Sequence, residues 1–277
     1  MSTYSLIALD IDGTMIGQAR TVSDDLRDAI ARVQGTGAVV SVATGRTLPP
    51  AARVARQSGA SGPVICFQGA MTFDQNLGKP LRHVTLSPSI AQSALESLTG
   101  VAERMLFIDN DVWVETESEW TNGYSERMEV NVLQCDSFND VIHKRPTAIV
   151  GIDDEQKIIP VVQSVRDTIG DRAIVTHSLP MFCEIEAVGA GKDHAVSELA
   201  TSLGIDRSAV VAVGDGKGDQ SMIEWAGLGV AVKGGHPEVE TTADRIIGTP
   251  ENGGLVSLLH ELCDNRLLVN PSMNTTK

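Results

Sequence analysis

The chain has 277 residues, of which 42% are hydrophobic and 21% charged, as expected of a globular protein with one large or two moderate domains. Its formal net charge of -14 opposes contact with nucleic acid phosphates and anionic lipid, so we expect neither as a partner. An anionic substrate is also repelled at long range. A phosphate site in this chain therefore needs strong local positive charge, including a metal ion.

Membrane and secretion signals are not evident in the sequence. No run of about 20 apolar residues is present, so we expect no membrane span. The N-terminal sequence MSTYSLIALD has no basic residue before its apolar run and indicates a first strand, not a signal peptide. Cys66, Cys135, Cys183 and Cys263 show no CxxC spacing, which indicates reduced thiols without zinc or disulfides. These features predict a cytoplasmic protein.

The N-terminal region alternates apolar runs with helical patterns. The runs SLIALD, AVVSVA and PVICF predict three buried strands. Helices are predicted between them at 23–33 and 48–58, with Ser23 as the cap of the first. Strands joined by helices indicate a parallel sheet with helices on both faces.

From His83 the pattern changes to adjacent strand pairs, which indicate a mixed or antiparallel sheet in an α+β module. The predicted elements are a helix at 87–98, strands at 104–109, 111–116 and 147–153, a helix at 155–169, and strands at 173–178 and 181–187. The alternation of strands and helices then returns, with helices at 192–203, 219–225 and 253–263 and strands at 209–214, 229–232 and 245–248. We therefore expect residues 1–82 and 186–277 to form a Rossmann-like, doubly wound α/β core and residues 83–185 to form an inserted α/β cap domain.

The strongest chemical signal is Asp10-Ile11-Asp12-Gly13-Thr14, directly after the first strand. Open parallel sheets place their sites at the carboxyl ends of strands. One carboxylate can attack or bind a metal ion while the other transfers a proton. A calcium loop beginning at Asp10 needs Glu at its twelfth position, where Thr21 stands. An ordinary turn after a strand is the remaining alternative.

Two further signals suit phosphate. Ala43-Thr44-Gly45-Arg46 ends the second strand, where a hydroxyl and a free N–H at a helix start can bind phosphate oxygens. Its alternative is a capping Thr beside a turn Gly. Lys192 begins a predicted helix and can act as a point charge for phosphate, although considered alone it is more readily interpreted as a solvated lysine.

The fourth signal is the loop Gly214-Asp215-Gly216-Lys217-Gly218-Asp219. It is superficially similar to a dinucleotide-binding loop, but Asp219 stands where the third Gly belongs, and the negative charge of Asp215 would repel a bound pyrophosphate. Two acids on one strand-end loop suit Mg²⁺. An acidic turn without function is the alternative.

In this order, the four signals resemble the motifs of the haloacid dehalogenase (HAD) superfamily, in particular its Cof-type phosphatases with a large α/β cap of the C2B type. The closing stretch from Gly229 to Gly254 is also similar, so the resemblance covers nearly the whole chain. It implies that Asp10 is the nucleophile and a metal ligand. It implies that Asp12 is the general acid and base, with its backbone carbonyl on the metal.

The same resemblance implies the remaining roles. Thr44, the N–H of Gly45 and Lys192 would hold the phosphoryl group. Asp215 would coordinate Mg²⁺ with support from Asp219. Arg46 is a further candidate for contact with the substrate.

Three positions depart from the family pattern. Gly218 replaces a usual Asn, Gln68-Gly69-Ala70 replaces Asn-Gly-Ala, and Lys233-Gly234-Gly235 replaces Gly-Asn-Ala. None removes a catalytic group, but they bear on the geometry of the metal loop, the rate and the substrate preference. Gly218 in particular predicts a flexible loop and weaker Mg²⁺ binding.

The predicted function is thus a Mg²⁺-dependent phosphohydrolase for a small phosphorylated metabolite, by default a sugar phosphate. The alternatives are a non-catalytic or weakly active phosphate-binding regulatory protein on the same fold and a sugar phosphomutase. A receiver-type signalling domain is disfavoured because Gln68, not Asp, follows the third strand. Candidates to face the leaving group in the cap are Trp113, Trp120, Tyr124 and Arg127. The oligomeric state is not readable from the sequence.

Overall fold

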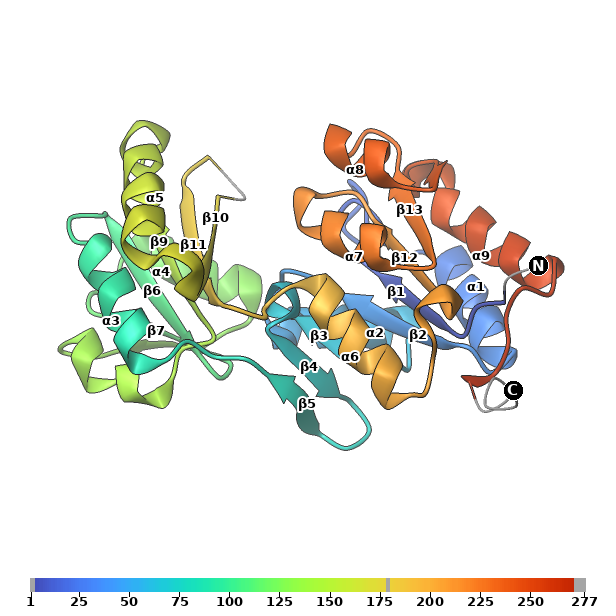
Figure 1. Cartoon of the computed structure of the whole chain (residues 1–277), viewed down its shortest axis with the longest axis horizontal. Helices are drawn as coiled ribbons and strands as arrows, with labels where there is room; N and C mark the ends of the chain where they lie inside the picture. The colour runs from blue at the N-terminus through green and yellow to red at the C-terminus, as the bar shows by residue number, and fades with distance from the viewer. Residues whose placement is uncertain (1–2, 178–179, 272–277) are drawn as a thin grey trace. The chain divides into compact units, whose positions relative to one another are not determined.

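A computed structural model describes residues 3–177 and 180–271, except for the side chains of residues 127 and 128. The chain divides into two compact units, one made of residues 1–82 and 191–277 and the other of residues 83–190 (Figure 1). The second unit continues beyond the expected end at 185, because the strand β11 (Phe182–Ala187) pairs within the sheet of that unit. In the described part of the chain, every helix is too short or too polar to cross a membrane.

The first unit contains an eight-stranded sheet of order β14-β13-β12-β1-β2-β3-β4-β5. The six strands from β14 to β3 run parallel, with Leu6 of β1 beside Val210 of β12 and Val39 of β2. The sequence did not predict β4, which is antiparallel to β3, or β5 at the edge. The strands are β1 (Leu6–Leu9), β2 (Val39–Ala43), β3 (Val64–Cys66), β4 (Met71–Asp74), β5 (Lys79–His83), β12 (Val210–Gly214), β13 (Leu228–Val232) and β14 (Arg245–Ile247).

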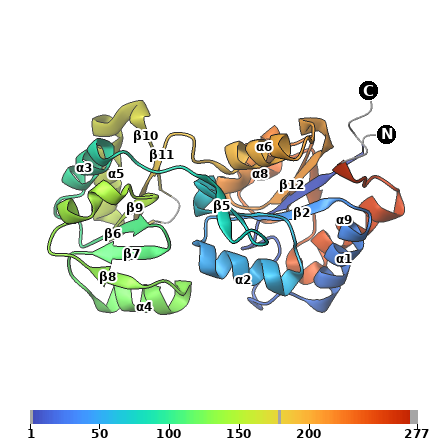
Figure 2. The same cartoon turned by 90° about the horizontal axis from the view of Figure 1, so that it is seen from below.

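Helices cover both faces of this sheet (Figure 2). Leu6 and Ala8 share a core cluster with residues of the helices on one face, whereas Ile7 and Leu9 are buried on the opposite face because side chains alternate along a strand. The first face carries α6 (Lys192–Ser202), α7 (Gln220–Trp225) and α8 (Pro237–Thr242), and the other carries α1 (Asp24–Gly35), α2 (Leu48–Ser58) and α9 (Gly254–Asp264). Ser23 caps α1 as predicted, since its side chain accepts from the N–H of Leu26.

The second unit contains a six-stranded sheet of order β10-β11-β9-β6-β7-β8. Its pairings are antiparallel except that of β7 with β8, so the predicted mixed α+β module is confirmed. One core cluster packs this sheet against α3 and α5. The elements are α3 (Pro88–Ser97), β6 (Glu103–Ile108), β7 (Asp111–Val114), α4 (Glu119–Met128), β8 (Val132–Gln134), β9 (Ala148–Ile152), α5 (Glu155–Ile169), β10 (Ala173–Thr176) and β11.

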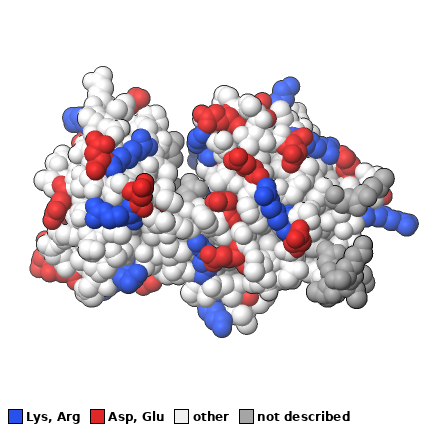
Figure 3. All heavy atoms as spheres, in the orientation of Figure 1, with Lys and Arg blue, Asp and Glu red and all other residues white. Residues whose placement is uncertain are grey.

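Charged side chains are distributed without a single dominant area on the face drawn in Figure 3, where Lys and Arg are interspersed with Asp and Glu. The predicted catalytic, phosphate-binding and metal-binding residues all lie in the first unit. They follow the carboxyl ends of β1, β2 and β12, which are adjacent in the sheet, and the start of α6. Parallel strands bring these loops to one edge of the sheet.

Candidate active site

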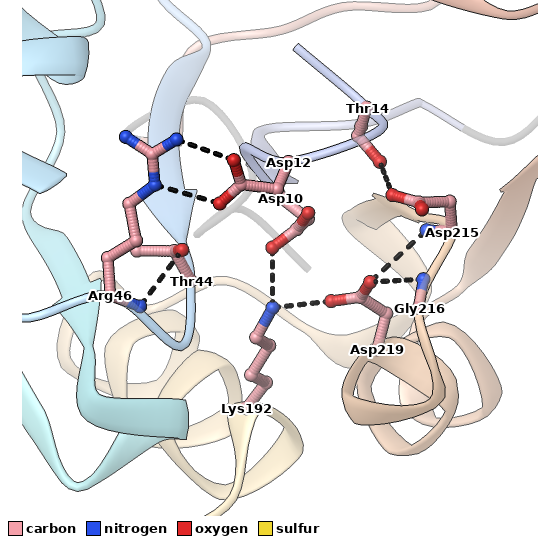
Figure 4. Close-up of polar contacts among 9 residues, drawn as sticks. All are labelled: Asp10, Asp12, Thr14, Thr44, Arg46, Lys192, Asp215, Gly216 and Asp219. Atoms are coloured by element: carbon pink, nitrogen blue, oxygen red, sulfur yellow. Dashed lines mark hydrogen bonds and ion pairs between the residues drawn. The ribbon is translucent and has the colours of Figure 1, made fainter. Parts of the chain in front are cut away.

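Asp10 directly follows β1 and is held by the sheet. Its backbone N–H donates to the carbonyl of Val213 at the end of β12, at 2.9 Å. Its side chain is buried, and its Oδ1 accepts a hydrogen bond from Nζ of Lys192 at 2.6 Å (Figure 4). Its second oxygen makes no hydrogen bond with a described residue. The carboxylate is therefore fixed on one side and open to reaction on the other.

Lys192 is the buried cation of the site. It is the first residue of α6 and is only 3% exposed. Its Nζ contacts Oδ1 of Asp10 and Oδ1 of Asp219, the latter at 2.5 Å. The sequence alone favoured a solvated lysine, whereas the structure makes Lys192 the link between the first and fourth motifs.

The loop after β12 is held by Asp219. Oδ2 of Asp219 accepts from the N–H groups of Asp215 and Gly216, at 3.1 and 2.9 Å. Asp215 accepts from the hydroxyl of Thr14 at 2.8 Å through Oδ1. Both oxygens of Asp219 are thus engaged within the protein, while Asp215 keeps one oxygen without a partner among the described residues.

Gly13 is required where the first motif passes Asp215. Its φ of +83° is in the left-handed region, and a Cβ at this position would lie 2.2 Å from Oδ2 of Asp215. Any side chain here would displace the carboxylate. The glycine of the motif therefore brings two loops together, in addition to allowing a turn.

Asp12 points to a different partner from that of Asp10. Its carboxylate accepts two hydrogen bonds from the guanidinium of Arg46, from Nε at 2.8 Å and from Nη2 at 2.5 Å. The side chain of Asp12 is 63% exposed. The hydrogen bond to Asp12 raises the pKa of Arg46 above its ordinary value, and burial opposes this rise only in part. Arg46, the candidate substrate contact, is thus bound to the predicted acid–base residue.

Thr44 and Gly45 form a tight turn after β2. Thr44 is buried, and its hydroxyl accepts from the N–H of Arg46 at 3.2 Å. A Cβ at Gly45 would lie 2.5 Å from Nε2 of Gln68, so a side chain at position 45 would have to displace that carboxamide. Gln68 was noted in the sequence only as a departure from the family pattern, and its place beside Gly45 was not predicted.

The electrostatics of the site are dominated by negative charge. Burial raises the pKa of Asp10 to about 8, with a further contribution from Asp219, although Lys192 acts in the opposite direction. Burial also raises the pKa of Asp215 to about 6, and Asp219 again adds to the effect. Burial lowers the pKa of Lys192, but the attraction of Asp10 and Asp219 outweighs it, and the net pKa is raised. One lysine does not neutralise three carboxylates, so a further cation would favour their ionised forms.

These carboxylates also have the geometry of a metal site. Asp10, Asp215 and Asp219 each offer one oxygen, and the three oxygens lie within 4.8 Å of one another. Oxygen donors suit a hard divalent cation. The group includes Asp219 in place of Asp12, whose side chain turns to Arg46.

Comparison with known proteins identifies the family. The model of haloacid dehalogenase-like hydrolases matches residues 7–259 of the chain. The chain belongs to the haloacid dehalogenase-like hydrolase family. The match covers the inserted unit, the three loops described above and the start of α6.

Several relatives of this HAD protein cover almost its full length. One is 5-amino-6-(5-phospho-D-ribitylamino)uracil phosphatase YcsE of Bacillus subtilis, 27% identical over 256 residues that cover 92% of this chain and 94% of the relative. A solved haloacid dehalogenase-like hydrolase from Bacteroides thetaiotaomicron has a TM-score of 0.84 at 23% identity and covers 94% of this chain and 99% of its own. The HAD subclass IIB sugar phosphatase BT4131 has a TM-score of 0.77 at 20% identity, covering 93% and 98%.

These comparisons confirm the predicted HAD family of the Cof type, the α/β fold and a phosphatase as the class of enzyme. The roles of single residues stay predictions. The structure brings Asp10, Lys192, Asp215 and Asp219 together and joins Asp12 to Arg46. Thr14 is the partner that the sequence analysis did not single out, although it ends the first motif.

The candidate substrate contacts in the cap of this HAD protein have packing partners. Trp120 stacks on Tyr124, with ring centroids 5.4 Å apart, and Phe182 meets Trp120 edge-on. Nζ of Lys144 lies over the ring of Trp113, 4.2 Å from the ring centroid. The side chain of Arg127 lies outside the described residues. The contact of these residues with a substrate stays a prediction.

Proposed function

We propose that this phosphatase uses Mg²⁺ and hydrolyses small organic phosphates through an aspartyl-phosphate intermediate on Asp10. The observation that carries the proposal is the buried carboxylate of Asp10, which Lys192 holds by one oxygen while Asp215 and Asp219 stand within metal-binding reach. Sugar phosphates are the first class to test. BT4131 is named a sugar phosphatase, and the compound in the name of YcsE carries its phosphate on a ribityl chain.

The residues of the chain divide the reaction between them. The free oxygen of Asp10 attacks phosphorus, so an Asp10–phosphorus bond forms as the bond to the leaving oxygen breaks. Lys192, the hydroxyl of Thr44 and the N–H of Gly45 hold the phosphoryl oxygens. Phosphoryl transfer depends mainly on such positioning and on charge neutralisation.

Asp12 is the proposed acid and base. It donates a proton to the leaving oxygen in the first half-reaction. In the second it removes a proton from the water that attacks phosphorus, as the bond between the Asp10 oxygen and phosphorus breaks and inorganic phosphate is released. Its two hydrogen bonds to Arg46 oppose protonation, so this role requires that Arg46 release at least one carboxylate oxygen. A substrate phosphate is an alternative partner for the guanidinium, which gives the two residues a reason to separate on binding.

The donor set fits Mg²⁺. Asp10 and Asp215 each have an oxygen without a hydrogen bond to a described residue, whereas both oxygens of Asp219 are engaged. We therefore assign Asp10, Asp215 and the backbone carbonyl of Asp12 as ligands and Asp219 as their support. A cation held there would supply the positive charge that stabilises the transferring phosphoryl group.

The test is a panel of sugar, nucleotide and cofactor phosphates, assayed for phosphate release in excess MgCl₂ and in excess EDTA. We expect turnover in MgCl₂ only, with a phosphorylated peptide containing Asp10 after acid quenching. Asp10→Asn is the matched control and should form no such peptide. Phosphate release without any phosphorylated intermediate contradicts the covalent mechanism. No release from any ester in MgCl₂ contradicts the function.

A further inference from the structure

Gln68 lies where three of the site loops meet. It belongs to the short turn Phe67–Gly69 after β3, and its φ of 50° and ψ of 26° are left-handed. Its N–H donates to the carbonyl of Thr44 at 3.2 Å. The neighbouring Gly69 packs on the backbone next to Lys192, since a Cβ on Gly69 would lie 2.8 Å from the nitrogen of Lys192. The turn is thus built against the phosphate-binding residues.

The carboxamide of Gln68 occupies space left by two glycines. A Cβ on Gly45 would lie 2.5 Å from Nε2 of Gln68, and a Cβ on Gly218 would lie 2.9 Å from Oε1. Real side chains do not approach so closely. The two glycines therefore leave room for the side chain of Gln68 in its observed position, between the turn after β2 and the loop after β12.

The carboxamide of Gln68 makes no hydrogen bond with the described residues. Oε1 is buried and accepts none from them, and Nε2 donates none to them. Buried polar atoms without a partner are uncommon because they lose their bonds to water. A methionine has nearly the same length and would fill the space without that loss. Packing explains the size of Gln68 but not its polarity.

We propose that Gln68 binds the substrate phosphate, with Nε2 donating to a phosphoryl oxygen held at Thr44 and Gly45. The position of Nε2 beside Gly45 supports this assignment, because the N–H of Gly45 is the proposed donor to the same group. The inference rests on the proposed function and adds a phosphate contact to it.

The variant Gln68→Met separates polarity from packing. We expect it to raise the inhibition constant of inorganic phosphate about two- to tenfold, the effect of one lost hydrogen bond, in a phosphate-ester assay with excess MgCl₂. Its melting temperature should be equal to that of the wild type or higher, because the buried unpaired oxygen is gone. A residue with only a structural role would not weaken phosphate binding while preserving or improving stability.

Thr72→Val is the matched control. The hydroxyl of Thr72 in β4 is also buried and has no hydrogen-bond partner in the part of the chain that the structure describes, but it lies outside the site loops. Its replacement should preserve or raise the melting temperature and leave the inhibition constant unchanged. If both variants are stable and neither changes phosphate inhibition, Gln68 does not contact phosphate.

Gly218→Ala tests the contact from the other side. The added methyl group must displace the carboxamide, so we expect weaker phosphate inhibition. In the Gln68→Ala background the same change should have little further effect, because nothing remains to be displaced. If the effects of Gly218→Ala and Gln68→Ala on the inhibition constant of phosphate add up in the double variant, the proposal is wrong. A wild type that hydrolyses no phosphate ester removes the proposed function and this inference together, whereas an active, phosphate-inhibited wild type with an unaltered Gln68→Met variant removes only the inference.

Discussion

Replacing Asp10 with Asn should affect activity and stability in opposite directions. The carboxyl group of Asp10 has its pKa raised from 3.8 to about 8. Between these values the folded protein binds a proton that the unfolded chain releases, so folding stability falls as the pH rises. At about 1.4 kcal/mol per pKa unit, this raised pKa lowers the free energy of unfolding at pH 7 by roughly 4 kcal/mol, compared with a side chain that does not titrate. Asn has no such cost.

The net gain should be smaller than this cost, because Lys192 keeps Asp219 but loses its contact with the carboxylate of Asp10. We expect Asp10→Asn to be more stable by about 1–3 kcal/mol in EDTA, a rise of several degrees in melting temperature. Turnover should fall at least about 10³-fold, since the proposed nucleophile is lost.

The assay is thermal unfolding of both proteins in excess EDTA and in excess MgCl₂, beside phosphate release from one ester. Mg²⁺ should raise the melting temperature of the wild type more than that of the variant, because binding to the folded state alone stabilises it. A variant that is less stable than the wild type in EDTA refutes the electrostatic reasoning. A variant with activity within about tenfold of the wild type refutes the covalent mechanism.

Three further results are expected. Asp12→Asn should slow hydrolysis most for esters with poor leaving groups and should let phosphorylated enzyme accumulate, and a normal rate on an alkyl phosphate would exclude the acid–base role. Chelation of the wild type should abolish turnover and MgCl₂ should restore it, whereas full activity in EDTA with no metal in the protein would count against the carboxylate site. Glu186→Gln should raise the stability of the folded protein at alkaline pH. Burial, with a further contribution from Glu184, raises the pKa of Glu186 from 4.5 to about 8. The contribution of Glu186 to wild-type stability is therefore most favourable below pH 4.5 and decreases as the pH rises toward 8. The melting temperature should fall between about pH 5 and about pH 9 in the wild type and in the exposed control Glu117→Gln, and should fall less in Glu186→Gln. An equal fall in all three proteins would argue against a buried protonated Glu186.

The sequence predicted the regular elements with strong periodicity. The helices α2 and α5 begin and end at the predicted residues, because apolar periodicity and terminal glycines define them. The strands β4 and β5 were not predicted, since β5 is largely polar and contains Pro80. The helix α4 was also missed, because its sequence EWTNGYSERM has few aliphatic residues and includes Gly123.

The site was predictable to the level of its loops and not of its contacts. The order of the four motifs placed the carboxylates after predicted strands and Lys192 at the start of a predicted helix. The pairing of Arg46 with Asp12 depends on side-chain directions that spacing does not define. The carboxamide of Gln68 lies between Gly45 and Gly218, a contact among residues far apart in the chain. Such contacts follow from tertiary packing.

The strand order has a consequence for the time at which the enzyme acquires activity during synthesis. The central pairing of the core joins Leu6 of β1 to Val210 of β12, whereas every strand of the second sheet pairs within residues 83–190. Long sequence separation makes such core pairing a late event in folding. The ribosome therefore synthesises residues 83–190 before it synthesises β12, and the inserted unit can fold first. Asp10 emerges early but meets Lys192 and Asp215 only when synthesis is well advanced, so the nascent chain should remain inactive until then.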